Sequence, residues 1–529
     1  MAALVAVALA CATATRAAPV FPVRHSANHR YLIDDHGAPF PILGRTAWFV
    51  LSLTPVDYHT FIDDTVSRGF TAIELHVVNH DPRGNHPPFD GDGNRPFVNR
   101  IGGAAWDGVL AGYRNAGDAP DFTTPNEKYW RFVDAFLAHC ESRGLLVFLF
   151  PAYVGDRGGD QGWMQEMVAN GGTRMRAYGA WMATRYKNQK NLVWMMGGDM
   201  GTGSSPFSAP QTDVERALRD GLQSISGQQS SQFSAEWTSE SIGTDQQTFG
   251  ASMTLNSVYS GYGDVYRQGR RAFAHTPVEP AFLLEEPYDE EGPDGTRVNA
   301  TATQPVRRFE WAGWLSTIGG YIAGNGYVWP FREATWRDRL SNIRTALRSP
   351  GRHWPSGGPG WREHLDTEGS RDLSRLNAFV NSISWHSLVP SGLAGMRRVI
   401  ALNGPADREP DDVAAAASPD GALLVAYVPP AHRSPIAVDM SAMAGTTRAR
   451  WFDPTSGAYV AVGADFRNGG VRSFSAPGNN SAGAADWVLV LDCPAVRISG
   501  GDPPREPAPS SSRQPTRRRA ADPVRTAFR

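Results

Sequence analysis

Between residues 19 and about 390, short apolar runs alternate along the chain with amphipathic stretches. This alternation is typical of βα units arranged around a parallel sheet. Two stretches, 126–143 and 173–186, carry apolar residues every three or four positions and predict helices. The apolar runs predict eight strands, the number that a closed barrel requires. They are 40–43, 70–78, 145–150, 192–196, 232–235, 253–258, 281–284 and 321–329.

After residue 399 the spacing of apolar residues changes to every second position, with turn residues between the runs. Several short alternating strands within about 100 residues are typical of a β-sandwich. The clearest runs are 422–427, 436–440, 449–452 and 487–491. The sequence therefore predicts an α/β fold. A (β/α)8 TIM barrel over residues 19–390 is followed by a small antiparallel β-sandwich over 391–498.

The two ends of the chain have different compositions. Residues 2–12 are apolar and are followed by small residues, which predicts a signal peptide over 1–18 and a secreted or periplasmic protein. The run has no preceding Lys or Arg, and Cys11 leaves lipoprotein anchoring as an alternative. Residues 499–529 are rich in Pro, Ser and Arg, which predicts a disordered basic tail.

Composition and charge exclude several classes of protein. The formal net charge of -2 argues against a nucleic-acid-binding protein, which needs an excess of Lys and Arg. After the signal peptide, no segment reaches the roughly 18 apolar residues of a membrane span. Cys140 and Cys493 are far apart and have no metal-ligand spacing around them.

Two acidic residues follow directly after predicted strands. The run 192–196 leads into Gly197-Gly198-Asp199, and the run 281–284 leads into Glu285. Because the carboxyl ends of parallel barrel strands open at one face, both carboxylates are expected at the same mouth. The glycines would leave room for a ligand. Asp199 could instead cap the following helix.

Paired carboxylates on a rigid barrel suit glycoside hydrolysis. One group protonates the leaving oxygen, while the other attacks the anomeric carbon or activates water. A separation of about 5 to 5.5 Å indicates retention of configuration, and a wider gap indicates inversion. Glu74 and Glu236 are alternatives, either as buried paired acids or as the true second carboxylate.

Aromatic and polar residues near the predicted strand exits are candidates for binding sugar. Aromatic rings would stack on the C–H faces of sugars, although core packing is an alternative for each ring. His76 and Asn79 could bind hydroxyl groups. The irregular loop 79–125 is expected to lie over the mouth. The aromatic candidates are Trp48, Trp163, Trp237, Tyr262, Tyr288 and Trp329.

Several motifs together resemble the apiosidase-like glycoside hydrolases, which are barrels followed by a collagen-binding-like domain. The resemblance covers most of the chain. It implies an acid/base at Asp199 and a nucleophile at Glu285. The family usually has Asp where this chain has Arg45, and Glu where it has Asp289. The motifs are Pro41-Ile42-Leu43-Gly44-Arg45-Thr46-Ala47-Trp48, Arg68-Gly69-Phe70-Thr71-Ala72-Ile73, Trp194 with Gly197-Gly198-Asp199, Glu285 with Tyr288-Asp289, and Asp486-Trp487-Val488-Leu489-Val490-Leu491.

These observations predict an apiosidase-like enzyme that cleaves a glycosidic bond in a plant or microbial polysaccharide. We expect a retaining, metal-independent mechanism without a cofactor, with Asp199 as acid/base and Glu285 as nucleophile. The expected partner is an oligo- or polysaccharide, and the chain is expected to be a monomer. The main alternative is a non-catalytic carbohydrate- or matrix-binding surface protein built on the same barrel. A lyase or a transglycosylase is a further alternative.

Overall fold

The computed structural model describes residues 18–110, 116–261, 264–285, 287–290, 305–331, 360–400, 413–430, 432 and 435–494. Apart from Ala18, the predicted signal peptide lies outside the described residues. So do the predicted tail, 499–529, and Tyr262.

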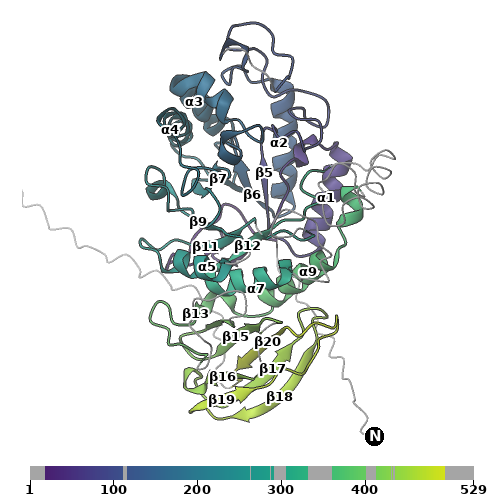
Figure 1. Cartoon of the computed structure of the whole chain (residues 1–529), viewed down its shortest axis with the longest axis vertical. Helices are drawn as coiled ribbons and strands as arrows, with labels where there is room; N and C mark the ends of the chain where they lie inside the picture. The colour runs from purple at the N-terminus through teal and green to yellow at the C-terminus, as the bar shows by residue number, and fades with distance from the viewer. Residues whose placement is uncertain are drawn as a thin grey trace, which may run out of the picture. The chain divides into compact units, whose positions relative to one another are not determined.

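Eight parallel strands form the central sheet, as the sequence predicts, and they curl into a near-closed barrel (Figure 1). In spatial order they run β8-β7-β6-β5-β4-β12-β11-β10, and the short β9 (Ser241–Ile242) adds to β10 antiparallel. The backbone N–H of Leu255 donates to Phe233 O at 3.0 Å and links the two ends of the sheet. The strands are β4 (Ile42–Thr46), β5 (Ala72–His76), β6 (Leu146–Phe150), β7 (Leu192–Gly197), β8 (Gln232–Glu236), β10 (Asn256–Tyr259), β11 (Ala281–Leu284) and β12 (Ile318–Ala323).

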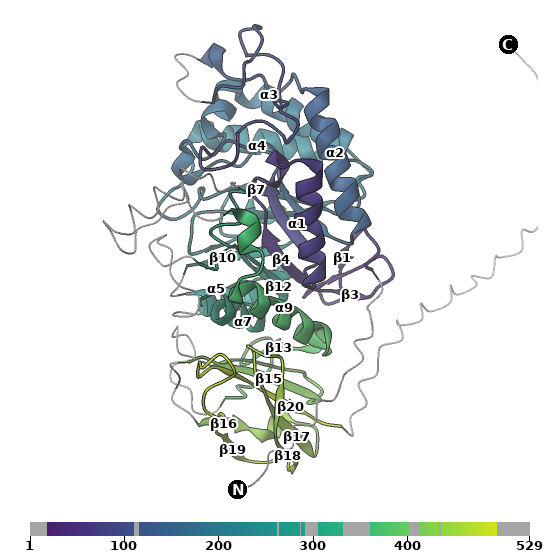
Figure 2. The same ribbon diagram turned by 90° about the vertical axis from the view of Figure 1, so that its right-hand side faces the viewer.

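Amphipathic helices cover the outside of this sheet (Figures 1 and 2). Asn126 caps α2 through a hydrogen bond from Lys128 N at 3.2 Å. That helix buries one apolar face, which includes Trp130, Val133 and Leu137. None of the helices in the described part of the chain is long and apolar enough to span a membrane. The helices are α1 (Pro55–Ser67), α2 (Glu127–Ser142), α3 (Met164–Arg185), α4 (Ala209–Gln223), α5 (Val265–Ala274), α7 (Pro305–Thr317) and α9 (Glu368–Asn381).

The last barrel strand differs from the predicted run 321–329. It begins at Ile318 and ends at Ala323, and the chain then turns at Gly324. A side chain at Gly324 would approach the Tyr288 ring within 2.2 Å, so only glycine fits there. Trp329 therefore lies in a turn after the strand. The sequence predicted a strand as far as residue 329 because apolar residues in this turn continue the apolar run of the strand.

The C-terminal module contains a six-stranded antiparallel sheet and a two-stranded one. Residues of β15 and β20 alternate between two cores: Leu424 and Leu489 pack towards β16 and β19, while Tyr427 and Val488 pack with barrel helix residues. Because both faces are buried, these strands are almost continuously apolar. The strands are β13 (Val389–Pro390), β14 (Ala414–Ala417), β15 (Leu423–Val428), β20 (Trp487–Asp492), β17 (Thr447–Phe452), β18 (Tyr459–Phe466), β16 (Ile436–Asp439) and β19 (Val471–Phe474).

A buried ionic network joins the module to α7 and α9. Arg307 of α7 donates to Asp486 at 2.8 Å and to Asp372 of α9. Asp486 also accepts hydrogens from Tyr427 at 3.0 Å and from Asn480 at 2.8 Å. All three charged side chains are at most 2% exposed. Their hydrogen bonds offset the cost of removing these charges from water.

Replacement of Asp486 by Ala is expected to destabilise the protein by about 3 to 5 kcal/mol, because Arg307 would lose a buried partner. Asp35 forms an exposed pair with Arg24, so Asp35→Ala should cost about 1 kcal/mol or less. Urea unfolding followed by circular dichroism measures both free energies. Equal losses in the two variants would contradict a structural role for the buried network.

Candidate active site

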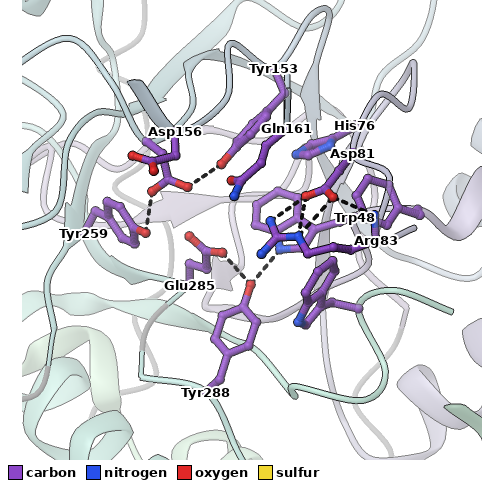
Figure 3. Close-up of a pocket in the computed structure, with 13 residues that line it drawn as sticks. Trp48, His76, Asp81, Arg83, Tyr153, Asp156, Gln161, Tyr259, Glu285 and Tyr288 are labelled. Carbon is purple, nitrogen blue, oxygen red and sulfur yellow. Dashed lines mark hydrogen bonds and ion pairs between the residues drawn. The ribbon is translucent and has the colours of Figure 1, made fainter. Parts of the chain in front are cut away.

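A pocket of about 290 Å³ opens at the carboxyl ends of the barrel strands (Figure 3). Tyr153, Tyr259, Glu285 and Tyr288 point into it from several different strand exits (Figure 3). Most of its lining side chains are polar or aromatic. They are Trp48, Phe49, His76, Asp81, Arg83, Tyr153, Asp156, Gln161, Asp199, Tyr259, Glu285, Tyr288 and Trp329.

Asp199 reaches the pocket from the end of β7, where two glycines shape the turn. Gly198 has φ +120°, and a side chain there would meet the Tyr153 ring at 2.3 Å. Gly197 likewise leaves room for the Trp237 ring. The glycines therefore make space for aromatic neighbours, which corrects the expectation that they make space for a ligand. Asp199 itself has φ +56°, a left-handed conformation that is strained for a residue with a side chain.

Two tyrosines hold the Asp199 carboxylate. The Tyr153 hydroxyl donates to Oδ2 at 2.6 Å, and the Tyr259 hydroxyl donates to Oδ1 at 2.6 Å. Burial raises the pKa of Asp199 above its usual value, while the two phenol hydrogen bonds oppose this rise.

Glu285 reaches the pocket from the end of β11. It also has a left-handed backbone, with φ +63°, and is 8% exposed. Its Oε1 accepts a hydrogen from the Tyr288 hydroxyl, which itself accepts a hydrogen from Trp48 Nε1 at 2.6 Å. The Trp48 indole therefore orients the phenol that holds Glu285.

Asp289 anchors the segment that carries Tyr288. Its Oδ2 accepts hydrogens from Thr367 at 2.7 Å, at the start of α9, and from Asn325 at 3.0 Å. Burial raises the pKa of Asp289 to about 6. Asp289 and Arg45 line a second cavity of about 20 Å³, outside the main pocket. The two departures from the family pattern therefore lie away from the pocket and not at its rim.

Glu236, at the end of β8, brings a third carboxyl group to the two acids. One oxygen from each of Asp199, Glu236 and Glu285 lies within 4.8 Å of the other two. Hard divalent cations also bind sets of carboxylate oxygens. Here, however, both oxygens of Asp199 already accept tyrosine hydrogens. These two hydrogen bonds favour a cluster whose acids interact through protons over one that holds a cation.

Stacked rings connect the surroundings of the two acids. The Tyr153 ring stacks on His76 with centroids 4.0 Å apart, and His76 lies 4.7 Å from the Trp48 ring. Burial, followed by the charge of Arg83, lowers the pKa of His76 well below its usual value. His76 is therefore a neutral packing partner that can offer one N–H or one lone pair.

The loop after β5 supplies an ion pair to the opposite wall of the pocket (Figure 3). Arg83 Nε donates to Asp81 Oδ2 at 2.9 Å, and its guanidinium lies 5.1 Å from the centre of the Trp329 ring. One side of Trp329 is thus in contact with a cation. The pair presents donors and acceptors that suit sugar hydroxyl groups.

Comparison with known proteins identifies the family. A model described as "Apiosidase-like, catalytic domain" matches residues 26–387, and one described as "Putative collagen-binding domain of a collagenase" matches 399–492. The chain belongs to the apiosidase-like family of glycoside hydrolases. No curated protein matches the sequence at a significant level.

Solved structures agree with this fold. One named "Glycoside hydrolase" is 18% identical, with a TM-score of 0.67 over 90% of this chain and 99% of that chain. A glycoside hydrolase family 5 protein from Bacteroides vulgatus ATCC 8482 is 19% identical, with a TM-score of 0.66 over 90% and 94% of the two chains. At these identities the similarity extends to the fold alone.

The pocket of this apiosidase-like protein gathers six of the predicted site residues and leaves three elsewhere. Trp163 is fully buried, with its indole donating to Val78 O at 3.1 Å, and Trp237 is 1% exposed, with its indole donating to Gly243 O at 2.8 Å. Both rings pack in the core, which corrects the prediction that they face substrate. Asn79 is also buried outside the pocket. The six that line it are Trp48, His76, Asp199, Glu285, Tyr288 and Trp329.

Sequence reasoning missed seven lining residues. Tyr259 ends a strand, so its position could have been found by the logic that found Glu285. The others lie in loops whose paths have no periodic signal. The missed residues are Phe49, Asp81, Arg83, Tyr153, Asp156, Gln161 and Tyr259.

Asp199→Asn is expected to stabilise the folded protein by about 1 to 2 kcal/mol at pH 7. Folding raises the pKa of the Asp199 carboxyl above the value of about 3.9 that an Asp has in the unfolded chain. The carboxyl therefore lowers the stability of the folded protein more and more as pH rises above that value. The gain should therefore shrink as pH falls towards 4. Thermal unfolding at several pH values measures it, with the exposed Asp63→Asn as control. A less stable Asp199→Asn at every pH would contradict this prediction.

Proposed function

We propose that this glycoside hydrolase cleaves a glycosidic bond in a plant or microbial polysaccharide with retention of configuration. Asp199 is the acid/base and Glu285 is the nucleophile. The observation that carries this assignment is the approach of their carboxylate oxygens to within 4.8 Å across one pocket. That distance favours the spacing of about 5 to 5.5 Å used by retaining enzymes over the roughly 6.5 to 9.5 Å of inverting ones.

The hydrogen bonds around each acid support its role. Tyr288 donates to the Glu285 carboxylate and stabilises the ionised form that attacks the anomeric carbon. Asp199 gives its proton to the leaving oxygen and later removes one from the attacking water. Burial favours its protonated form and the two tyrosines favour its ionised form, so both steps are accessible.

We also propose that the protein is exported and meets its polysaccharide outside the cytoplasm, on the evidence of the apolar run at residues 2–12. Mass analysis of the mature N-terminus from a producing cell tests this. An intact residue 1 in the mature protein would contradict it.

Asp199→Ala and Glu285→Ala are each expected to lower kcat/KM by roughly a hundredfold or more on a substrate found by a glycan digestion screen. Asp213→Ala, at an exposed site on α4, serves as the control. NMR of the first product formed should show retained anomeric configuration. Near wild-type cleavage by either pocket variant would refute the assignment. Saturable binding without product would instead support a binding protein.

Tyr259→Phe is expected to move the alkaline limb of the pH–rate profile upwards by about half to one unit. The variant loses a donor that lowers the pKa of Asp199, so the acid keeps its proton to a higher pH. The profile of kcat/KM against pH measures this shift. Tyr58→Phe, on α1 outside the pocket, should leave the limb in place. A downward shift in Tyr259→Phe would contradict the acid role of Asp199.

A further inference from the structure

Polar side chains line the barrel interior beneath the catalytic pocket. Glu236 and Glu74 are both 0% exposed, and neither oxygen of either residue has a hydrogen-bond partner among the described residues. Thr46 pairs in register with Glu74, and its hydroxyl also lacks a partner there. Buried polar groups nearly always have a hydrogen-bond partner in folded proteins, so these carboxyls need an explanation.

Glu236 is fixed relative to the catalytic pair by its own backbone. Its carbonyl oxygen accepts the Gly198 N–H at 2.6 Å, next to Asp199. Its carboxyl lies within 4.8 Å of oxygens of both Asp199 and Glu285. Glu236 is fully buried and is not among the residues that line the pocket.

The groups that face Glu236 come from several strands. Asp199 follows β7, Glu285 follows β11, Glu74 lies on β5, and the Tyr153 phenol follows β6. Each of these is an acid or a phenol. Arg83, a cation that lines the pocket, is paired with Asp81. No ionised neighbour among these groups compensates a negative charge on Glu236.

We propose that Glu236 is a positioning residue that remains a neutral carboxylic acid throughout the reaction and offers its O–H to the catalytic pair. This inference rests on the proposed roles of Asp199 and Glu285. A third negative charge in the cluster would favour proton uptake by Glu285, which would disable the nucleophile. A neutral carboxyl adds a hydrogen-bond donor without adding charge.

The electrostatics of the site support a neutral Glu236. Burial first, and then Glu285, Asp199 and Glu74, raise the pKa of Glu236 well above its usual value, while the nearby backbone N–H of Asp199 opposes this rise. The pKa of Glu74 is raised as well, by burial. The two acids therefore hold protons in the same part of the barrel.

Two substitutions test the role through the pH–rate profile. Glu236→Gln keeps a neutral donor, so kcat/KM should stay within about threefold of wild type and both limbs should stay in place. Glu236→Met keeps the volume but has no donor. It should lose on the order of tenfold in kcat with little change in KM, and its acid limb should move to higher pH. Equal profiles for the Met and Gln variants would reduce Glu236 to a packing residue and overturn the proposal.

The direction of the shift in Glu236→Gln distinguishes a neutral from an ionised Glu236. If Glu236 were ionised in the active enzyme, the change to Gln would remove a negative charge and move both limbs to lower pH. That shift would overturn the proposal. Activity that depends on added Ca²⁺ or Mg²⁺, and loses this dependence in Glu236→Gln, would overturn it as well, because cation ligands must be deprotonated.

Two measurements need no substrate and therefore separate this inference from the proposed function. The infrared difference spectrum of wild type minus Glu236→Gln at pH 7 should contain the C=O stretch of one protonated carboxyl. A carboxylate band in its place would overturn the proposal. The melting temperature of Glu236→Gln should rise relative to that of wild type as pH increases above the pKa that Glu236 has in the unfolded chain. Above that pH, the raised pKa of Glu236 in the folded state lowers the stability of the wild type.

Glu310→Gln is the matched control. Glu310 is an equally buried acid on α7, and its carboxyl has no hydrogen-bond partner among the described residues. Burial raises its pKa too. This variant should reproduce the pH-dependent gain in stability without any change in the pH–rate profile. If it altered the profile as Glu236→Met does, the effect would not be specific to the cluster.

Discussion

The site depends on the enclosure of three carboxyl groups within 4.8 Å of one another at the carboxyl end of the barrel strands. Ionised acids at this spacing repel each other, and burial removes the water that would screen them. The hydrogen-bond partners that offset this repulsion differ among the three carboxyl groups. Asp199 accepts two phenol hydrogens, Glu285 accepts one, and Glu236 has no such partner among the described residues.

Aromatic residues hold the Asp199 and Glu285 carboxyls in place, as charged partners do in many other sites. The Tyr153 ring stacks on His76, and His76 lies beside the Trp48 ring. The Tyr153 hydroxyl donates to Asp199, and the Trp48 indole donates to the Tyr288 phenol that holds Glu285. Because fused or stacked rings have few rotatable bonds, they hold the acids at a defined distance with little entropic cost.

The C-terminal module is connected to this arrangement through α9. Arg307 links Asp486 of the module to Asp372 of α9. The first turn of the same helix binds Asp289 through Thr367. Asp289 lies next to Tyr288, which orients Glu285. A continuous set of contacts therefore links Asp486 of the module to the segment that carries Glu285.

Periodicity in the sequence was sufficient to predict the eight barrel strands, the sandwich, and the delivery of Asp199 and Glu285 to strand ends. These features depend on local patterns, because an apolar run must be buried and the end of a parallel strand must open at one face. The positions of Tyr288, Trp48 and His76 at the pocket were predicted by the same rule, because each lies near the end of a predicted strand.

The tertiary structure alone decided which side chains meet across the barrel. Trp163 and Trp237 have the same local signals as Trp48, yet they pack in the core, because loops of irregular path bring other rings against them. Tyr153, Asp81 and Arg83 reach the pocket from such loops. The protonation of Glu236 likewise depends on neighbours from three other strands. Distances between residues far apart in the chain set these properties, and no local pattern encodes them.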